Sequence, residues 1–429
     1  MQAKLSTRIL FLTLMAVVYV VTAWFFDWLG FAPAKDEIHY WPTTLRFAAE
    51  PLPSVELLRS YDEYSTPLPF MIFGWLESAF GAGLFAGRLF NALLSFGIAC
   101  VFVLTARAET SRVLLSVVGA WSFPYLIGTS VYLYTDVLAV AGAFVGLVSI
   151  RRQHWILSAA AFVVAVSSRQ YMVAVPIAIA VYRITQLLSG TESFRRRLQS
   201  ALIDPTLLAC AAGFLALLGW IVFFWGLTPP YSSIAPPSTT SAGIFFPQHG
   251  LYFLAVIGVY YVPLAWLLLD RGASKEPFGM KRALLASVLL LAVAFFIFPP
   301  LGNPDDYGIE TMGFLDKFLR WVLGEHEALR LVVLWGAASL CFWRFRRWSL
   351  ASALVWTHAL LLMKAHIAWD KYAMICLLCL WYLQADAPAT PSENTDSKKQ
   401  SDRDSRSRGR QTMGSGVRPH RSKPVFVST

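Results

Sequence analysis

Residues 31–42 read FAPAKDEIHYWP, and residues 61–69 read YDEYSTPLP. These segments lie at the two ends of the first long polar interval between apolar runs of membrane length. Each contains an acidic pair beside aromatic side chains: Asp36 and Glu37 in the first, Asp62 and Glu63 in the second. If the preceding apolar run spans a membrane, both pairs emerge on its far side. The sidedness of the chain therefore decides where its polar chemistry takes place.

Composition predicts an integral membrane protein. Of the 429 residues, 56% are hydrophobic and 14% are charged, whereas soluble domains carry about 25% charged residues. Helices are expected throughout, because a helix pairs its own backbone groups within lipid. The net charge of +10 lies largely in short connections and in the C-terminal tail. This distribution is typical of membrane orientation and argues against nucleic acid as a partner.

The apolar runs predict about twelve transmembrane helices. Alternate connections between them are basic, which places those connections and both termini in the cytoplasm. The interval 31–83 is then an outer loop, in which residues 67–80 are predicted to form an interfacial helix. The expected spans cover residues 9–31, 84–105, 113–131, 136–150, 155–168, 171–186, 206–225, 251–269, 283–299, 328–343, 349–363 and 372–384.

The chain divides into a membrane domain, residues 1–384, and a basic cytoplasmic tail, residues 385–429. The tail is rich in Ser, Arg, Lys, Asp and Pro and is predicted to be disordered. Its segment 403–410 is either a weak attachment to anionic lipid or a solvated stretch without a role. All five cysteines fall in apolar runs. Cys376 and Cys379 are therefore expected to pack in a helix rather than to bind metal or carry out redox chemistry.

Asp36 is the first choice for a catalytic base, and Glu37 is the second. A sugar transferase that inverts its anomeric centre needs a carboxylate to accept the proton of the attacking hydroxyl. It also needs cationic groups to stabilise a departing phosphate. An acid beside Lys35 at the membrane surface suits a base that faces a sugar carried by a lipid. The alternative is an acidic pair that only keeps positive charge out of the outer loop.

Charged side chains also interrupt apolar runs elsewhere. Such residues are costly in a membrane and are usually paired or functional. One outer connection is basic against the charge rule, which indicates a site for an anionic phosphate. The alternatives are ordinary turn residues and lysines that extend to the membrane surface. The phosphate-binding residues predicted in this way are Arg169, Gln170, Lys364, His366 and Lys371.

Further polar residues expected on the outer face are assigned to the acceptor or the sugar: His39, Tyr40, Asp62, Glu63, Asp136, Gln248 and His249. No metal-ligand spacing and no glycine-rich nucleotide loop occurs in the sequence. We therefore expect no metal and no cofactor. The sugar would come from a lipid carrier rather than from a soluble nucleotide sugar.

Four of these stretches resemble one enzyme family. KDEIH (35–39), YDEYSTPLP (61–69), YLYTD (132–136) and SRQ (168–170) occur in the order and spacing of the dolichyl-phosphate-glucose α-1,2-glucosyltransferases. FPQH (246–249) and residues 364–372 resemble the same family more weakly. The resemblance extends over residues 8–384 in layout and implies a GT-C membrane glycosyltransferase. Tyr171 and Met172, and the acidic run 62–65, depart from the family pattern and leave sugar and acceptor open.

The resemblance implies inverting transfer of a hexose, with glucose the best guess. The donor would be a polyprenyl- or dolichyl-phosphate sugar, and the acceptor a lipid-linked saccharide or glycan on the non-cytoplasmic face. A bacterial plasma membrane is the favoured location, with the endoplasmic reticulum membrane as the alternative. A transporter or flippase of lipid-linked saccharides is the competing class, although no inverted repeat is found. An O-antigen polymerase or ligase would be expected to have a larger late loop than residues 302–327.

Overall fold

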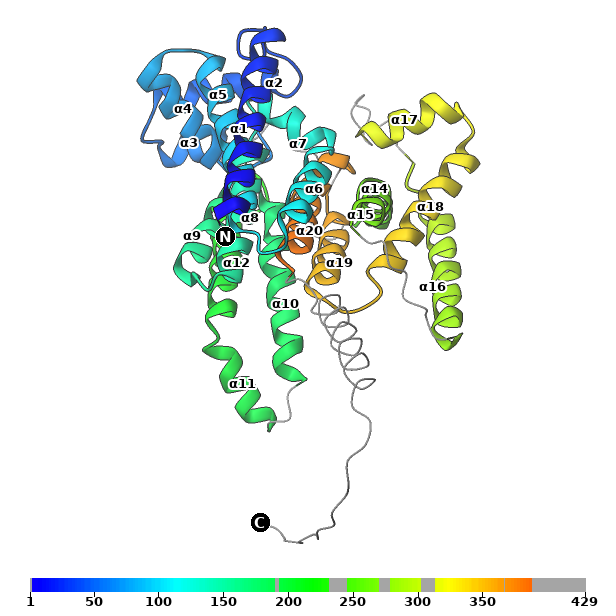
Figure 1. Cartoon of the computed structure of the whole chain (residues 1–429). Helices are drawn as coiled ribbons and strands as arrows, with labels where there is room; N and C mark the ends of the chain where they lie inside the picture. Colours follow the sequence, from blue (N-terminus) through cyan, green and yellow to red (C-terminus); the bar gives the residue numbers. More distant parts are fainter. Residues whose placement is uncertain are drawn as a thin grey trace, which may run out of the picture. The chain divides into compact units, whose positions relative to one another are not determined.

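The computed structural model describes residues 2–189, 193–230, 245–269, 278–301, 313–365 and 367–387. Within these ranges the chain is helical and contains no strand, so the predicted all-α class is confirmed (Figure 1). The helices in the first half are α1 (Gln2–Phe25), α2 (Glu37–Ala49), α3 (Val55–Ser60), α4 (Leu68–Phe80), α5 (Leu84–Thr105), α6 (Thr110–Trp121), α7 (Pro124–Gly128), η1 (Thr129–Val131), α8 (Asp136–Arg151), α9 (Trp155–Ser168), η2 (Gln170–Val173) and α10 (Ala174–Leu188). Those in the second half are α11 (Phe194–Leu202), α12 (Pro205–Phe224), α14 (Pro247–Tyr260), α15 (Val262–Leu268), α16 (Phe278–Ile297), α17 (Gly313–Leu323), α18 (Glu327–Arg344), α19 (Leu350–Leu362), η4 (Asp370–Ala373) and α20 (Met374–Asp386).

Several helices have the length and composition of membrane spans. Five meet both criteria, and a bent pair, α6 with α7 and η1, raises the number to six. The pair bends by 75° where Pro124 begins α7, as expected of a residue that cannot donate to the preceding turn. The chain is therefore an α-helical membrane protein. The five spans are Leu5–Phe25, Leu84–Thr105, Gln170–Leu188, Pro205–Phe224 and Pro247–Leu268.

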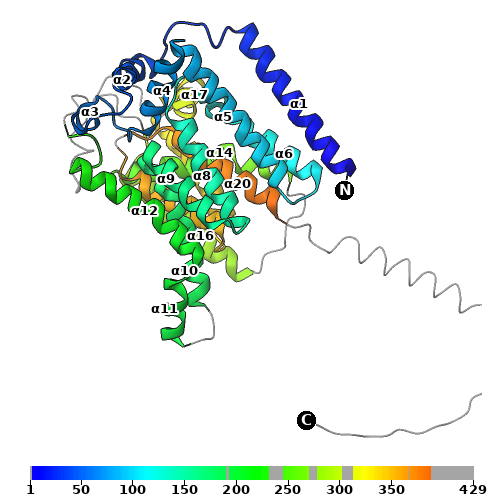
Figure 2. The same cartoon turned by 90° about the vertical axis from the view of Figure 1, so that its left-hand side faces the viewer.

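Helix α1 lies at the periphery. In Figure 2 it runs beside α5 and α6, and it packs against these two helices. Leu10, Val20 and Trp24 project from it with at least half of their surface exposed. Arg8 ties its first turns to the end of α5 by donating hydrogen bonds to the carbonyls of Val103 and Ala106. A helix so apolar and so exposed is suited to contact lipid.

Helices α8, α14 and α20 form the centre of the molecule. Nearly every residue of α8 is buried, which agrees with its apolar character on all sides. Gly142 permits the close approach of α9, because a Cβ there would lie 2.9 Å from the Ala161 carbonyl oxygen. Helix α20 packs against α6, α8 and α19, and its Cys376 and Cys379 are buried free thiols. These cysteines pack within the core, as the sequence predicted.

The first polar interval is folded rather than extended. Helices α2, α3 and α4 occupy it, and α4 packs on α2 and α5. The helix predicted over residues 67–80 is present as α4, and Gly81 ends it in the left-handed conformation with φ +58°. Phe70 and Phe73 of α4 are buried in a small aromatic core. The interval therefore has a fixed shape that can position side chains.

The predicted start of the tail is wrong by a few residues. Helix α20 continues to Asp386, and that side chain is fully buried. The sequence misplaced the boundary because the composition becomes polar from residue 385, whereas the burial of Asp386 depends on arginines from distant parts of the chain. Residues 388–429, with the tail predicted to be disordered, lie outside the described residues.

Candidate functional site

Polar residues from distant parts of the sequence meet at one end of the helices. Helix α8 begins at Asp136, and the neighbouring α9 ends immediately before Arg169. Helix α2 begins directly after Asp36, and η4 begins at Asp370. Hydrogen bonds connect these termini to one another. The first polar interval, the start of α8, the end of α9 and the approach to α20 thus form a single site.

Asp36 is the open carboxylate of the first acidic pair. Its Oδ2 accepts a hydrogen bond from Nζ of Lys371 at 3.0 Å. The Asp36 side chain is 25% exposed, whereas that of Lys371 is 5% exposed. Lys35, just before it, has φ +57°, a conformation that non-glycine residues adopt at a cost and that is concentrated at functional sites. Asp36 therefore combines one ionic partner with access for another molecule.

Glu37 is the closed carboxylate of the same pair. Its two oxygens accept hydrogen bonds from Nε and Nη2 of Arg88 at 2.9 and 2.6 Å. Oε1 also accepts from the backbone nitrogen of Leu133 at 2.6 Å, and Oε2 from that of Ala34 at 3.2 Å. Glu37 and Arg88 are both fully buried. This geometry assigns Glu37 to joining α2, α5 and the 132–134 turn, and it leaves Asp36 as the accessible carboxylate of the pair.

Arg169 and Asp136 form the buried centre of the site. Nη2 of Arg169 donates to Oδ2 of Asp136 at 3.0 Å and to the hydroxyl of Tyr40 at 2.8 Å. The hydroxyl of Tyr171 donates to Oδ1 of Asp136 at 3.0 Å. Among the described residues, Nε of Arg169 is buried and has no hydrogen-bond partner. Buried donors are almost always paired in folded proteins, so the Arg169 guanidinium retains an unused donor.

The second acidic pair is also divided into an open and a buried member. Asp62 is half exposed and lies 4.0 Å from Nη1 of Arg46, whereas Glu63 is 4% exposed. Oε1 of Glu63 is buried without a hydrogen-bond partner. Burial raises the pKa of the Glu63 carboxyl to about 8, against the attraction of nearby Arg169. Glu63 is therefore mainly neutral at pH 7 and can donate a hydrogen bond.

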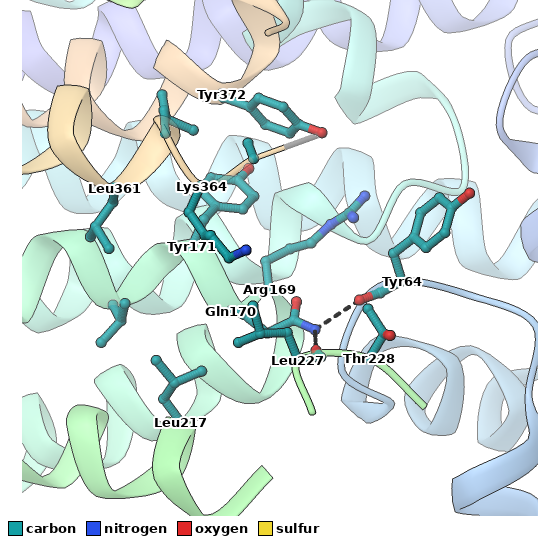
Figure 3. Close-up of a pocket in the computed structure, with 13 residues that line it drawn as sticks. Tyr64, Arg169, Gln170, Tyr171, Leu217, Leu227, Thr228, Leu361, Lys364 and Tyr372 are labelled. Atoms are coloured by element: carbon teal, nitrogen blue, oxygen red, sulfur yellow. Dashed lines mark hydrogen bonds between the residues drawn. The ribbon is translucent and has the colours of Figure 1, made fainter. Parts of the chain in front are cut away.

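A cavity of about 190 Å³ opens beside Arg169. Figure 3 shows Arg169 and Tyr64 on one side of it and Leu217 and Leu361 on another. Lys364 also lines this cavity. Cationic groups beside an apolar wall match a molecule with an anionic group attached to a hydrocarbon chain.

Gln170 fixes one wall of this cavity, which we call the Arg169 pocket. Its Nε2 donates to the carbonyl of Tyr64 at 2.7 Å and to that of Leu227 at 2.8 Å (Figure 3). The bonds link η2 to the first polar interval and to the residues after α12. Both amide hydrogens are engaged, so the structure gives Gln170 a positioning role rather than direct contact with phosphate.

A second cavity, of about 420 Å³, lies beside Asp36. Lys371 and Lys35 line it together with Asp36, and the remaining wall includes Tyr132 and Trp369. The ammonium of Lys371 lies 4.1 Å from the centre of the Trp369 ring. We call this cavity the Asp36 pocket. Aromatic walls with a few convergent polar groups are typical of sites for small organic ligands.

Asp370 holds the turn that carries Lys371. Its Oδ1 accepts from the hydroxyl of Tyr252 at 2.7 Å, and its Oδ2 accepts from the backbone nitrogen of Leu315 at 2.8 Å. Burial raises the pKa of the Asp370 carboxyl to about 6. Asp370 thereby connects η4 to α14 and to the first turn of α17. These links keep Lys371 within reach of Asp36.

The other predicted residues lie less centrally. His39 is exposed on α2, and Gln248 is half-buried on α14. Nδ1 of His249 lies 2.7 Å from the Ala365 carbonyl oxygen, which links α14 to the turn after Lys364. His366 lies outside the described residues.

Sequence reasoning missed Arg88, Tyr171 and Trp369. Arg88 carried a usable signal, because it stands inside the apolar run 84–105 and a charged residue there calls for a partner. The two aromatic residues carried none, since aromatics are frequent throughout this chain. Only the fold brings Tyr171 to Asp136 and Trp369 to Lys371.

Within the described ranges, no group of three or more His, Cys, Asp or Glu residues is arranged to hold a metal ion. The expectation of an enzyme without metal or cofactor stays a prediction. Comparison with protein-family models, with curated proteins and with solved structures finds no match to this chain. The resemblance to glucosyltransferases therefore rests on the short motifs alone.

Proposed function

We propose that the chain is a GT-C-type glycosyltransferase that moves a hexose, with glucose the best guess, from a polyprenyl- or dolichyl-phosphate carrier to a lipid-linked saccharide or glycan. The observation that carries the proposal is the pairing of an open carboxylate, Asp36, with a cationic and apolar pocket at the same end of the helices. A lipid-phosphate sugar has an anionic group between a hydrocarbon chain and the reacting carbon. The site offers a matching feature for each part.

The donor is assigned to the Arg169 pocket. Its phosphate would accept hydrogen bonds from Nε of Arg169 and from Lys364, and its hydrocarbon chain would lie against Leu217 and Leu361. Charge-assisted bonds to phosphate are about twice as strong as neutral ones. They strengthen further as the sugar departs and negative charge collects on the phosphate oxygen.

The acceptor is assigned to the Asp36 pocket. The acceptor hydroxyl oxygen attacks the anomeric carbon, and the bond from that carbon to the phosphate oxygen breaks. The hydroxyl proton passes to the Asp36 carboxylate, and the polyprenyl phosphate leaves with the bonding electrons. Lys371 holds the Asp36 carboxylate in place, because its ammonium donates a hydrogen bond to Oδ2 at 3.0 Å.

The proposed topology has about twelve spans with this site on the non-cytoplasmic face, and a bacterial plasma membrane is favoured over the endoplasmic reticulum. The shorter apolar helices Trp155–Ser168, Ser287–Ile297 and Leu350–Leu362, together with α8, α18 and α20, would complete the count. The competing flippase would place its polar residues near the midplane of the membrane. The described polar residues instead gather at helix ends, which supports the transferase.

The test is a product assay with purified full-length protein. Polyprenyl-phosphate [14C]glucose is incubated with lipid-linked oligosaccharide, and both products are separated. We expect one polyprenyl phosphate released for each new glycoside. Vesicle experiments in which the labelled donor changes leaflet without forming a glycosidic bond would overturn the transferase in favour of the flippase.

A further inference from the structure

A second group of charged residues lies at the opposite end of α8 from the candidate site. Asp386, the last residue of α20, is fully buried there. Its two oxygens accept hydrogen bonds from Nε and Nη2 of Arg107 at 2.8 and 2.6 Å, and Oδ2 also accepts from Nε of Arg151 at 2.9 Å. Nη2 of Arg152 lies 3.9 Å from Oδ1. Three guanidinium groups therefore surround one carboxylate.

A fourth arginine adds to this excess of positive charge. Arg112 donates to the backbone and side-chain oxygens of Gln384 at 3.0 and 2.8 Å, so its partner is neutral. Glu109 is the one further acid in the turn between α5 and α6. Even with Glu109 included, the four arginines and two acids carry a net charge of +2.

We call Arg107, Arg112, Arg151, Arg152 and Asp386 the Asp386 cluster. Its carboxylate is inaccessible, whereas the three arginines around it are 46%, 34% and 31% exposed. Each guanidinium has five N–H donors in a fixed planar arrangement. The inner donors of Arg107 and Arg151 are used on Asp386 and those of Arg112 on Gln384, which holds these side chains in place, and Arg152 makes a longer ionic contact with Asp386. The outer donors are thereby presented to the surroundings without the usual cost of ordering a long side chain.

The position of the cluster indicates what those donors meet. It lies where α5, a candidate membrane span, ends at Thr105 and where α8 and α20 end. Helix α8 has 16 residues, so the cluster is about 24 Å from the candidate site along that helix. Arginines at the end of a membrane span lie at the level of the lipid headgroups. Basic pockets between helix ends at this level are suited to anionic lipid headgroups.

We infer that the Asp386 cluster is a binding site for the phosphodiester headgroup of an anionic phospholipid. The phosphate oxygens accept hydrogen bonds from the outer N–H groups of Arg112 and Arg152. Asp386 holds the neighbouring arginines in position. This site is independent of the proposed glycosyl transfer. It differs from the general attraction of basic loops to membranes, because the buried carboxylate fixes the geometry.

A paired variant isolates this site from general surface charge. Arg112→Gln with Arg152→Gln removes two outward donors and leaves the short bonds of Arg107 and Arg151 to Asp386 intact. The control is Arg195→Gln with Arg196→Gln, which removes the same charge from exposed positions on α11. Binding is measured by native mass spectrometry on full-length protein in detergent, with dioleoyl phosphatidylglycerol and with dioleoyl phosphatidylcholine. Water-soluble glycerol phosphate is titrated separately.

The wild-type protein and the α11 control are expected to prefer phosphatidylglycerol over phosphatidylcholine by about tenfold or more, which corresponds to one charge-assisted contact. The cluster variant should lose most of that preference, and Arg152→Lys should lie between. Equal binding of the two lipids, or an equal loss in the α11 control, would overturn the inference. Glycerol phosphate binding as tightly as the lipid would overturn the lipid assignment in favour of a soluble anion. If the cluster variant does not fold, Arg152→Lys alone is compared with Arg195→Lys, and an unchanged preference overturns the site.

Discussion

Asp36 and Glu37 are adjacent carboxylates with opposite environments. Glu37 is fully buried and accepts hydrogen bonds from Arg88 and two backbone nitrogens. Asp36 has one ammonium partner and borders a cavity of about 420 Å³. A carboxylate with every acceptor position used can only hold the fold, because a new partner would have to displace an existing one. A carboxylate with open positions can accept a proton from another molecule.

The same division separates the two cations. Arg88 donates hydrogen bonds to Glu37 and to the Phe31 carbonyl. Arg169, in contrast, retains a buried Nε that has no hydrogen-bond partner among the described residues. The buried Arg88–Glu37 ion pair therefore has a structural role in the fold. Arg169 keeps an unused donor and also lines a cavity, so it is the better candidate for a binding group.

The largest expected effect follows from removing the open carboxylate. Asp36→Asn keeps the shape of the side chain and removes the proton acceptor. General-base catalysis typically contributes about 10²- to 10⁴-fold, so turnover should fall by that factor. Donor binding and the thermal unfolding midpoint should remain near wild type. A variant with wild-type turnover would move the base to another carboxylate.

The closed pair should respond in the opposite way. Arg88→Met leaves Glu37 charged and buried, which should destabilise the fold by about 3–5 kcal/mol. Unfolding is followed by tryptophan fluorescence in detergent. Adding Glu37→Gln to the same variant should restore part of the loss, because the uncompensated charge is removed. Normal stability of Arg88→Met would contradict the scaffold role.

A smaller effect is expected at the rim of the Arg169 pocket. Lys364→Gln should raise the Kd for a polyprenyl-phosphate sugar by about tenfold, the value of one charge-assisted contact. The matched control is Lys317→Gln, because Lys317 lines the Asp36 pocket instead. This variant should leave the Kd for the donor within about twofold of the wild-type value. Equal weakening by both variants would indicate general surface charge instead of a donor pocket.

The smallest effect is a pH dependence from Glu63. The charges that act on it are Arg169, Asp36, Asp62 and Lys371, and burial holds its pKa at about 8. Above pH 8 Glu63 ionises beside the pocket, so the Kd of an anionic donor should rise by about three- to tenfold between pH 7 and 9. Glu63→Gln should abolish that rise. A steep rise that persists in Glu63→Gln would assign it to another group.

The same shift has a consequence for stability. Because the folded state raises the pKa of Glu63 above its ordinary value of 4.5, the folded protein holds this proton more tightly than the unfolded chain. The contribution of Glu63 to stability is therefore fully present below pH 4.5 and is lost as the pH rises towards 8. Thermal midpoints of wild type and Glu63→Gln should converge at low pH and separate in favour of the variant at high pH.

Sequence patterns predicted the helical membrane class and several of the charged residues that gather at the site. Charges inside apolar runs, such as Asp136 and Arg169, were informative because an unpaired charge is costly to bury in a membrane. Each of them was therefore expected to have a partner. The patterns ranked Asp36 ahead of Glu37 as a base, but they did not predict that Glu37 is fully buried, because the two neighbours are both acidic residues of one polar segment. That distinction depends on Arg88 and the Leu133 backbone, which only the tertiary fold brings to Glu37. The end of α20 was misplaced for a similar reason, because Asp386 is buried by arginines from other turns.

The most direct test of the central claim, that Asp36 is an open base, is chemical rescue. Asp36→Ala leaves space beside Lys371 for a small carboxylate, so added formate should restore turnover by about tenfold or more. Chloride at the same ionic strength should have no effect, and Glu37→Ala should not be rescued. If Asp36→Ala folds and binds donor normally but formate leaves its turnover unchanged, the carboxylate at this position is not the base.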